Sequence, residues 1–412
     1  MAAEEIQPHK KKKKKTSRQP SSSISSLSFS SFPDEIKETI LARVSRWKYP
    51  WLSLVSKRFC SLLSSKEIYK ARSQIGAKET CFYVCLSHKD SHPSWFSLWT
   101  KPGAKRKAKG KGRKNWFNKD SSGTSVVRTP FSSSQCPLVP DHFTLTVGSE
   151  FYIIGGPYQK PSSSVRVLDC RSHTWRDAPN MIVARENPFA AFVDEKIYVM
   201  GGCEIDEYPS NWIEVFDMKT QSWTALPGPG ADEAELRYLL RRGYNHDLVE
   251  VFEGKLYVAI EEKEYAYGVK DGTWKLVRPK SSFLLEYQMC SCEIENVIYC
   301  CTGYGVLMWS YSSGTEGREW RDIEGLEELR EDRSRGLESE GSSKFLVENY
   351  GGKLLVMWQI SGKKQRNKIW YAKISLESRC NGREVWGNVE CVDMLTFPVE
   401  SFESFQCLTA SV

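Results

Sequence analysis

Two stretches of the chain repeat one pattern, Phe151-Tyr152-Ile153-Ile154-Gly155-Gly156 and Ile197-Tyr198-Val199-Met200-Gly201-Gly202. Each is a short run of β-branched and aromatic residues, which is typical of a buried strand, and each ends in two glycines. Glycines at a strand end allow backbone conformations closed to other residues and a close approach of neighbouring chain. A tryptophan follows both runs at a similar distance, as Trp175 and Trp223. The pattern indicates a repeated structural unit.

Degenerate copies of this unit, without a diglycine after the strand, lie along the chain. Similar β-rich runs begin at Cys81, Lys255, Val297 and Lys353, and the last three are followed by Trp274, Trp320 and Trp386. The five tryptophans are separated by 48, 51, 46 and 66 positions. The longest step contains the 17-residue charged segment Glu328 to Lys344, and without it the step is 49 residues. A period near 50 residues therefore persists through the array.

A diglycine after a strand and a later tryptophan, repeated at this period, are the kelch signature of a four-stranded propeller blade. The tryptophan is expected to supply burial between neighbouring blades. Six β-rich runs predict six blades, and the clearest repeats cover about 148–195 and 196–245. The ring is expected to close by pairing of the C-terminal strand, around Phe402 to Val412, with the first blade. The residues expected to build the blades are Gly155, Gly156, Trp175, Gly201, Gly202 and Trp223.

Helical periodicity precedes the blades. A first helix is predicted from Pro33, a residue that suits the first turn, and it carries apolar residues at helical spacing, namely Ile36, Ile40, Leu41 and Val44. A second is predicted from Pro50, with one face formed by Leu52, Val55, Phe59 and Leu62. A third is predicted from Ser64, which has capping-box spacing to Glu67. Helices this short bury little alone, so either they form a small bundle without a partner or another surface covers them.

The helical segment carries a family resemblance. Its motifs Phe32-Pro33-Asp34-Glu35-Ile36, Leu41 to Arg46 and Leu52 to Phe59 resemble the F-box of plant F-box/kelch-repeat proteins, with Phe32 where that family usually has leucine. In that family the F-box docks on a Skp-type adaptor of a cullin–RING ubiquitin ligase. The resemblance implies an adaptor-binding face presented or supported by Phe32, Pro33, Ile36, Leu41, Val44, Leu52, Val55 and Phe59.

The basic charge of the chain is concentrated in two tracts. The first 20 residues hold seven bases and two acids, and Lys101 to Lys114 hold eight bases and no acid. Together they exceed the net charge of +7, so the remainder of the chain is mildly acidic. The N-terminal tract is interpreted as a disordered Lys/Ser-rich tail that could serve in nuclear import or polyanion binding. The second is interpreted as a solvated interstrand loop, with import or polyanion contact as alternatives.

The sequence offers little for bond-making chemistry. It contains no Gly-x-Ser-x-Gly, no phosphate loop and no His-Glu-x-x-His motif, so no catalytic residue, cofactor or enzyme activity is expected. A zinc site at Cys81, Cys85, His88 and His92 is disfavoured, because strand geometry separates the two cysteines by about 13 Å. Cys290 and Cys292 alternate within a probable strand and are interpreted as small core residues. No metal site is expected.

The predicted fold is a small all-α F-box module followed by an all-β six-bladed kelch-type propeller. The expected divisions are a tail at 1–30, the F-box at 31–75 and the propeller at 80–412. Thirteen scattered cysteines, no apolar leader segment and no long apolar run indicate a reducing compartment, the nucleus and/or cytoplasm, and no membrane partner.

The predicted function is that of a substrate receptor of an SCF-type (Skp–cullin–F-box) ubiquitin ligase, with a Skp-type adaptor and an unidentified target protein as partners. Two alternatives remain open, a ligase-independent kelch scaffold and a nucleic-acid-associated regulator that uses the basic tracts. Nucleic acid is not the expected partner. Target recognition is assigned to propeller loops, with candidate regions near Cys203 to Asn211 and Lys160 to Ser164.

Overall fold

The computed structural model describes residues 29–88, 93–100, 124–128, 144–156, 160–172, 174–203, 211–226, 246–252, 254–260, 263–278, 290–302, 305–311, 320–329, 345–359 and 366–412. The N-terminal tail before residue 29 and the basic tract Lys101 to Lys114 lie outside these residues. Predictions about those segments therefore remain predictions.

Residues 29–79 form a helical module. It consists of α1 (Asp34–Ala42), α2 (Tyr49–Ser53), α3 (Lys57–Leu63) and α4 (Lys66–Gln74), with 3-10 turns at Phe29–Ser31 and Arg46–Lys48. Serine side chains set the helix starts: the Phe59 amide donates to Ser56 Oγ at 3.2 Å, and the Ile68 amide donates to Ser65 Oγ at 3.2 Å. These N-caps satisfy amides that have no partner within the helix.

Two helix predictions need correction. The single helix predicted from Pro50 to Leu62 is wrong, because Ser56 adopts an extended conformation (φ −164°, ψ 160°) and caps a new helix, α3. The chain therefore bends between α2 and α3, and Val55 is exposed while Leu62 is buried. The third helix is capped by Ser65 and not by Ser64, which ends α3.

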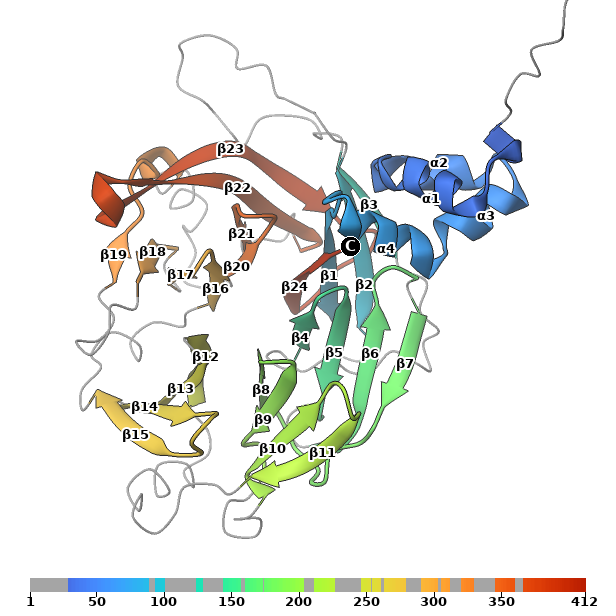
Figure 1. Cartoon of the computed structure of the whole chain (residues 1–412). Helices are drawn as coiled ribbons and strands as arrows, with labels where there is room; N and C mark the ends of the chain where they lie inside the picture. Colours follow the sequence, from blue (N-terminus) through green and yellow to red (C-terminus); the bar gives the residue numbers. More distant parts are fainter. Residues whose placement is uncertain are drawn as a thin grey trace, which may run out of the picture.

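The rest of the described chain builds six four-stranded antiparallel sheets (Figure 1). Five of them follow chain order. Their strands are β4 (Thr144–Val147), β5 (Glu150–Ile154), β6 (Val165–Asp169) and β7 (Thr174–Ala178); β8 (Phe189–Val193), β9 (Lys196–Met200), β10 (Ile213–Asp217) and β11 (Ser222–Leu226); β12 (His246–Phe252), β13 (Lys255–Ile260), β14 (Lys263–Gly268) and β15 (Trp274–Arg278); β16 (Cys290–Ile294), β17 (Val297–Cys301), β18 (Leu307–Ser310) and β19 (Arg321–Asp322); and β20 (Phe345–Asn349), β21 (Leu354–Trp358), β22 (Lys368–Arg379) and β23 (Glu384–Thr396).

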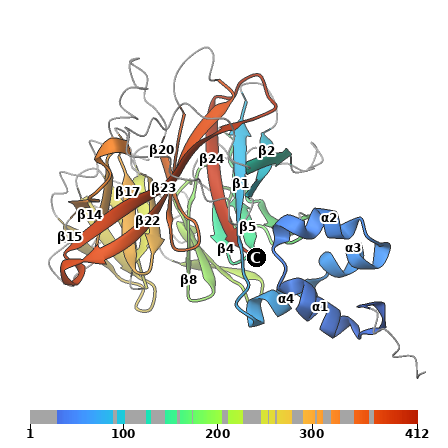
Figure 2. The ribbon, with the colours of Figure 1, turned by 90° about the horizontal axis from the view of Figure 1, so that it is seen from above.

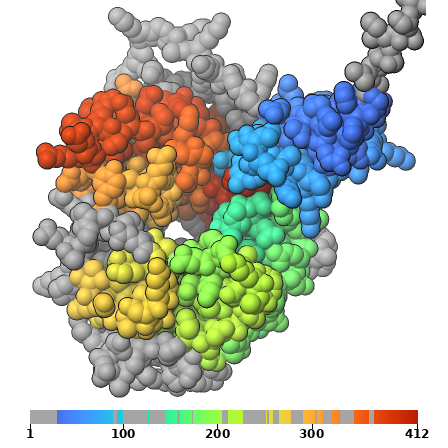
Figure 3. All heavy atoms as spheres, viewed as in Figure 1, coloured from blue at the N-terminus to red at the C-terminus, as the bar shows by residue number. Residues whose placement is uncertain are grey.

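The sixth sheet joins the two ends of the propeller. Its strand order is β24-β1-β2-β3, with β24 at Ser404–Ser411, β1 at Thr80–Ser87, β2 at Ser94–Thr100 and β3 at Thr124–Arg128. Strands β1 and β24 pair along their whole length, from Thr80 opposite Ser411 to Ser87 opposite Ser404. The predicted closure by the C-terminal strand is confirmed, and the six blades form a ring around a narrow central opening (Figure 3).

Apolar side chains fill the seams between neighbouring blades. One cluster contains Tyr152, Ile154 and Val167 of the β4–β7 blade together with Ile197 and Phe216 of the β8–β11 blade. The repeated tryptophans lie in or beside the outermost strands: Trp175 in β7, Trp223 in β11, Trp274 in β15, Trp386 in β23, and Trp320 just before β19. The 50-residue period is therefore one blade, and the predicted fold class is confirmed.

The glycine pairs lie where connections between strands crowd together. A Cβ at Gly156 would lie 1.9 Å from the Lys160 carbonyl oxygen, and at Gly202 it would lie 2.3 Å from the Glu186 carbonyl oxygen. Gly202 also has φ +70°, a conformation that disfavours other residues. Only glycine fits both positions without movement of backbone. Trp223 bridges blades by donating from Nε1 to the Pro179 carbonyl at 2.7 Å.

A buried ion pair supports the same seam. Arg185 and Glu214 are both fully buried, and Arg185 Nη2 lies 2.9 Å from Glu214 Oε1. Arg185 Nη1 also donates to the carbonyls of Gly201 (2.6 Å) and Trp212 (3.1 Å), while Glu214 accepts from the amides of Ile182 (2.6 Å) and Val183 (3.0 Å). Hydrogen bonds of this kind to both charged groups are what make a buried ion pair tolerable.

Among the described strands, β22 and β23 form the longest hairpin, with 12 and 13 residues. Its outer part crosses the β16–β19 blade (Figure 1), whose outermost strand has two residues. The Glu324 amide donates to the Val385 carbonyl at 2.9 Å, and the Gly387 amide donates to the Glu324 carbonyl at 2.8 Å. The hairpin thus extends the hydrogen bonding of the neighbouring blade.

Candidate functional site

The helical module leaves an unusual number of large apolar side chains in solvent. Ten such residues are exposed in the described part of the chain, and five belong to this module of about 50 residues. The five, which we call the apolar face, are Ile36 (45% exposed), Ile40 (42%), Trp51 (71%), Leu54 (79%) and Val55 (65%). An exposed apolar concentration of this kind marks an interaction site more often than a random surface.

Helix α1 exposes apolar side chains and buries a charged one. Ile36 and Ile40 lie one helical turn apart and point to solvent, while Lys37 is only 7% exposed and Leu41 only 4%. The ammonium of Lys37 is paired with Asp34 at 3.3 Å. Burying a lysine and exposing two isoleucines costs free energy in the isolated chain, so this arrangement favours a partner on the exposed side.

An ion pair brings the two halves of the apolar face together. Asp34 at the start of α1 contacts the guanidinium of Arg58 on α3. The hydrogen bond from Arg58 lowers the pKa of the Asp34 carboxyl below its ordinary value. This contact lies within three residues of both Ile36 and Val55, so the first turn of α1 and the α2–α3 connection are neighbours.

The structure separates the eight residues predicted for an adaptor-binding face into three groups. Pro33, Ile36 and Val55 are exposed, and Leu41 lies in the core. The others are partly buried, namely Phe32, Val44, Leu52 and Phe59. All of these except Phe32 pack on the core of the module. Exposed residues can present a face, whereas buried ones can only support it. The prediction of a docking role itself stays a prediction.

Three exposed residues of the apolar face were not predicted for it: Ile40, Trp51 and Leu54. The position of Ile40 on the same side as Ile36 was predictable, because the two residues lie one helical turn apart. Trp51 and Leu54 could not be placed from the sequence, because their exposure results from the bend between α2 and α3. That bend depends on the extended conformation of Ser56.

The module and the propeller share one hydrophobic core. Leu41, Tyr49 and Ile68 belong to the same buried cluster as Tyr83 of β1, Phe151 of β5 and Leu408 of β24. Figures 1 and 2 show the helices at one rim of the ring, beside the β24-β1-β2-β3 and β4–β7 blades. The two parts are therefore packed against each other and not joined by a free linker.

Two buried arginines reinforce this joint. Arg72, which is 1% exposed, donates from Nη1 to the carbonyls of Ala42 (3.0 Å) and Val44 (2.8 Å) and pairs with Glu79 at 3.2 Å. Arg46, which is 4% exposed, contacts Cys81 Sγ and reaches the Cys170 carbonyl at 3.4 Å.

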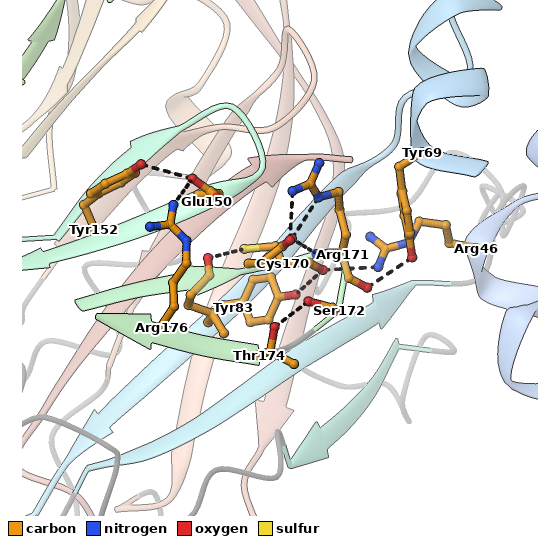
Figure 4. A network of polar contacts seen from close by, with 12 residues as sticks. Arg46, Tyr69, Tyr83, Glu150, Tyr152, Cys170, Arg171, Ser172, Thr174 and Arg176 are labelled. Atoms are coloured by element: carbon orange, nitrogen blue, oxygen red, sulfur yellow. Dashed lines mark hydrogen bonds and ion pairs between the residues drawn. The ribbon is translucent and has the colours of Figure 1, made fainter. Parts of the chain in front are cut away.

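The joint also includes two tyrosines (Figure 4). Tyr69 of α4 donates from its hydroxyl to the Arg171 carbonyl at 3.2 Å, and Tyr83 of β1 donates to the Cys170 carbonyl at 3.1 Å. Arg46 lies over the Tyr69 ring, 5.5 Å from its centroid. Arg46, Tyr69 and Tyr83 therefore all donate to backbone carbonyls of the β6–β7 turn, and this turn is where the module packs on the propeller.

The helical module contacts only one end of strand β6. The β6–β7 turn at Cys170 and Arg171 touches the helical module, so the β5–β6 connection lies at the opposite end of β6. The predicted loop Lys160 to Ser164 belongs to that opposite end. The Gly156 amide of this connection donates to the Arg185 carbonyl at 3.0 Å, and the adjacent Glu186 amide donates to the Gly202 carbonyl at 2.8 Å. The β5–β6 and β9–β10 connections, which contain Gly156 and Gly202, therefore lie at the same end of their blades. Most of the second predicted loop, Cys203 to Asn211, lies outside the described residues.

Residues singled out for metal or thiol chemistry occupy structural positions. Cys81 and Cys85 lie on β1, and the ring nitrogens of His88 are 3.1 Å from the Ser401 carbonyl and 3.1 Å from Ser94 Oγ. His92 lies outside the described residues. Cys290 and Cys292 pack against the core between the β16–β19 and β20–β23 blades, where burial raises the pKa of the Cys292 thiol. Within the described ranges, no three His, Cys, Asp or Glu residues are grouped to hold a metal ion.

No helix in the part of the chain that the structure describes is long and apolar enough to span a membrane.

A helical module with an exposed apolar face, fused to a six-bladed kelch propeller, defines the class of F-box proteins with a kelch-repeat domain. Comparison with known families agrees: residues 29–71 match the F-box domain, and residues 95–396 match the FKB95, Kelch-repeats domain. The chain belongs to the F-box/kelch-repeat protein family, as the resemblance of its motifs predicted.

Relatives from Arabidopsis thaliana match the chain over nearly its whole length. F-box/kelch-repeat protein At5g39560 is 41% identical over 430 residues, which cover 99% of this chain and 97% of the relative. F-box/kelch-repeat protein At4g19870 is 40% identical over 423 residues, covering 99% of each. F-box/kelch-repeat protein At4g19865 is 42% identical over 393 residues, covering 94% and 93%.

Proposed function

We propose that this chain is a substrate receptor of an SCF-type ubiquitin ligase. Its apolar face would dock on a Skp-type adaptor, and its propeller would bind the target protein. The observation that carries this proposal is the exposure of Ile36, Ile40, Trp51, Leu54 and Val55 on a module that belongs to the F-box family. Covering these side chains with a partner is favourable by about 25 cal/mol per Å² of apolar surface that is removed from water.

The proposed mechanism is positional and not catalytic. A receptor that holds its target beside a ubiquitin-loaded enzyme raises the local concentration of target lysines and so accelerates transfer by proximity. The blade end opposite the helical module is the proposed target site, because the module occupies the end that carries the β6–β7 turn. We also propose that the protein acts in the nucleus and/or cytoplasm, where thiols stay reduced.

Adaptor capture tests the proposal directly. A purified Skp-type adaptor is passed over the immobilised full-length chain and over a variant carrying Trp51→Ala, Leu54→Ala and Val55→Ala. Capture by the parent and loss in the variant are expected. The matched control replaces three exposed apolar residues of the propeller, Ile182→Ala, Leu276→Ala and Val277→Ala, and should capture adaptor as the parent does.

Three other outcomes would contradict the proposal or favour another function. Absence of capture by a folded parent chain would contradict a ligase role and favour a ligase-independent kelch scaffold. Equal capture by all three proteins would contradict the apolar face as the docking site. A nucleic-acid-associated role would show instead as DNA or RNA binding with a steep dependence on salt.

A further inference from the structure

The strand that closes the ring, β24, also lies inside the joint between the helical module and the propeller. Val412, which follows it, is 5% exposed and belongs to the same buried cluster as Leu41 and Ile68 of the module. Leu408 and Ala410 of β24 belong to this cluster as well. The closing strand therefore forms part of the surface on which the helices pack.

Glu79 connects this strand to the module by hydrogen bonds. Its amide donates to the Val412 carbonyl at 2.7 Å, and the Val412 amide donates to the Glu79 carbonyl at 3.0 Å. The Glu79 carboxylate accepts from the Arg46 amide at 3.0 Å and pairs with Arg72 at 3.2 Å. One residue thus touches Val412 beside the closing strand and both buried arginines of the module.

The closing strand has a third attachment. The Ser411 amide donates to the Gly148 carbonyl, which lies in the turn before β5, at 3.3 Å. Ser411 and Val412 consequently join the closing blade, the neighbouring β4–β7 blade and the helical module. Helices of five to nine residues are marginal without tertiary contacts, so the module depends on this support for its order.

We infer that the helical module is held in place only when strand β24 has closed the ring, because Glu79 links Val412 to Arg46 and Arg72. Order in the module then depends both on ring closure and on the link through Glu79 that connects the closed ring to the module. A chain whose closing strand detaches, or one that stops before Ser411 and so lacks the pairing of Glu79 with Val412, loses the ordered module. This inference goes beyond the proposed ligase role and holds whatever partner the module binds.

Hydrogen–deuterium exchange of the full chain provides the test, and it does not require an adaptor. The first variant lacks Ser411 and Val412. The second is Glu79→Gln, which keeps the ring complete but removes the charge that pairs with Arg72. The control is Lys78→Ala, a change at an exposed neighbouring residue. Peptides from α1 and α4 report on the module, and peptides from β8–β11 report on a distant blade.

Both test variants are expected to exchange at least about tenfold faster in α1 and α4, with β8–β11 unchanged and the control like the parent. The inference is overturned if the shortened chain keeps full protection of α1 and α4 while its distant blade stays folded. If the shortened chain is unfolded throughout, Glu79→Gln decides in the same way. Unchanged protection of α1 and α4 in that variant overturns the inference.

Discussion

Glu348 is a carboxyl group in an environment that disfavours its charge. It lies on strand β20, where Thr409 of the closing strand β24 donates a hydrogen bond to it at 3.2 Å. Burial raises the pKa of Glu348 to about 8. Since the folded-state value is above the unfolded one, its contribution to stability is complete at low pH and is lost as pH rises through about 8.

Replacing Glu348 by a neutral amide, Glu348→Gln, should therefore stabilise the protein in alkali. The variant is expected to keep the Tm near the parent's at pH 5 and to raise it by about 3–6 °C at pH 9, measured by thermal denaturation. Glu293→Gln, at an exposed glutamate on the neighbouring strand β16, serves as the control and should change the Tm by about 1 °C or less at either pH. A Glu348→Gln variant no more stable than the parent at pH 9 would show that the carboxyl is solvated.

The pair Arg185 and Glu214 predicts a second residue effect. Glu214→Ala would leave a fully buried guanidinium without its carboxylate and two amides without acceptors, so a loss of about 3–5 kcal/mol is expected in denaturant unfolding. Asp177→Asn, which breaks the exposed pair of Asp177 with Arg166, should cost less than about 1 kcal/mol. Similar losses in the two variants would contradict the structural role given to the buried pair.

Among the elements, the β22–β23 hairpin has a role that its length explains. Its outer part supplies hydrogen bonds to residue Glu324 beside the two-residue strand β19. Trp386 fixes this part, since its Nε1 donates to Glu384 at 3.0 Å and Arg379 lies 4.5 Å from its ring centroid.

Trp386→Ala should loosen the neighbouring blade as well as its own. We expect a loss of about 2 kcal/mol of unfolding free energy and faster hydrogen exchange in residues 321–326. Trp51→Ala is the matched control, because Trp51 is 71% exposed and should leave stability unchanged. Unaltered exchange at 321–326 in the Trp386 variant would contradict the bridging role.

The strands and helices differ in how well the sequence predicts them. The strands near Phe151 and Ile197 were predictable because their apolar runs and glycines record local geometry. The break between α2 and α3 was not, since Leu52, Val55 and Phe59 keep helical spacing across it. A serine cap at Ser56 outweighs that spacing, and only tertiary packing shows that it does.

At the scale of the whole molecule, ring closure was predictable from the repeat count, whereas the contact between module and ring was not. The joint uses Arg46, Arg72 and Glu79, whose charges read as surface residues in the sequence. Their burial follows from a core shared by segments as distant as α1 and β24. Long-range packing of this kind leaves no periodic trace in the sequence.

The basic insertion between β2 and β3 should be dispensable for the fold. Thr100 and Thr124 are directly paired, so residues 101–123 can be replaced by Asn-Gly, a two-residue turn suited to such a hairpin. The shortened chain is expected to keep its Tm within about 2 °C and to bind adaptor as before. A large loss of Tm would show that the insertion supports the blade. Salt-sensitive DNA or RNA binding lost on shortening would instead assign it a nucleic-acid role.

A calorimetric titration of a Skp-type adaptor into the full-length chain, the Leu54→Asp variant and the Leu276→Asp control tests whether the apolar face is the docking site. Leu54 is 79% exposed on the apolar face and Leu276 is 48% exposed on the propeller, so neither change should disturb the fold. We expect the parent and the control to bind with equal affinity and Leu54→Asp to weaken binding at least about tenfold, or about 1.4 kcal/mol. Failure of the folded parent to bind, or equal binding by all three proteins, would contradict this expectation.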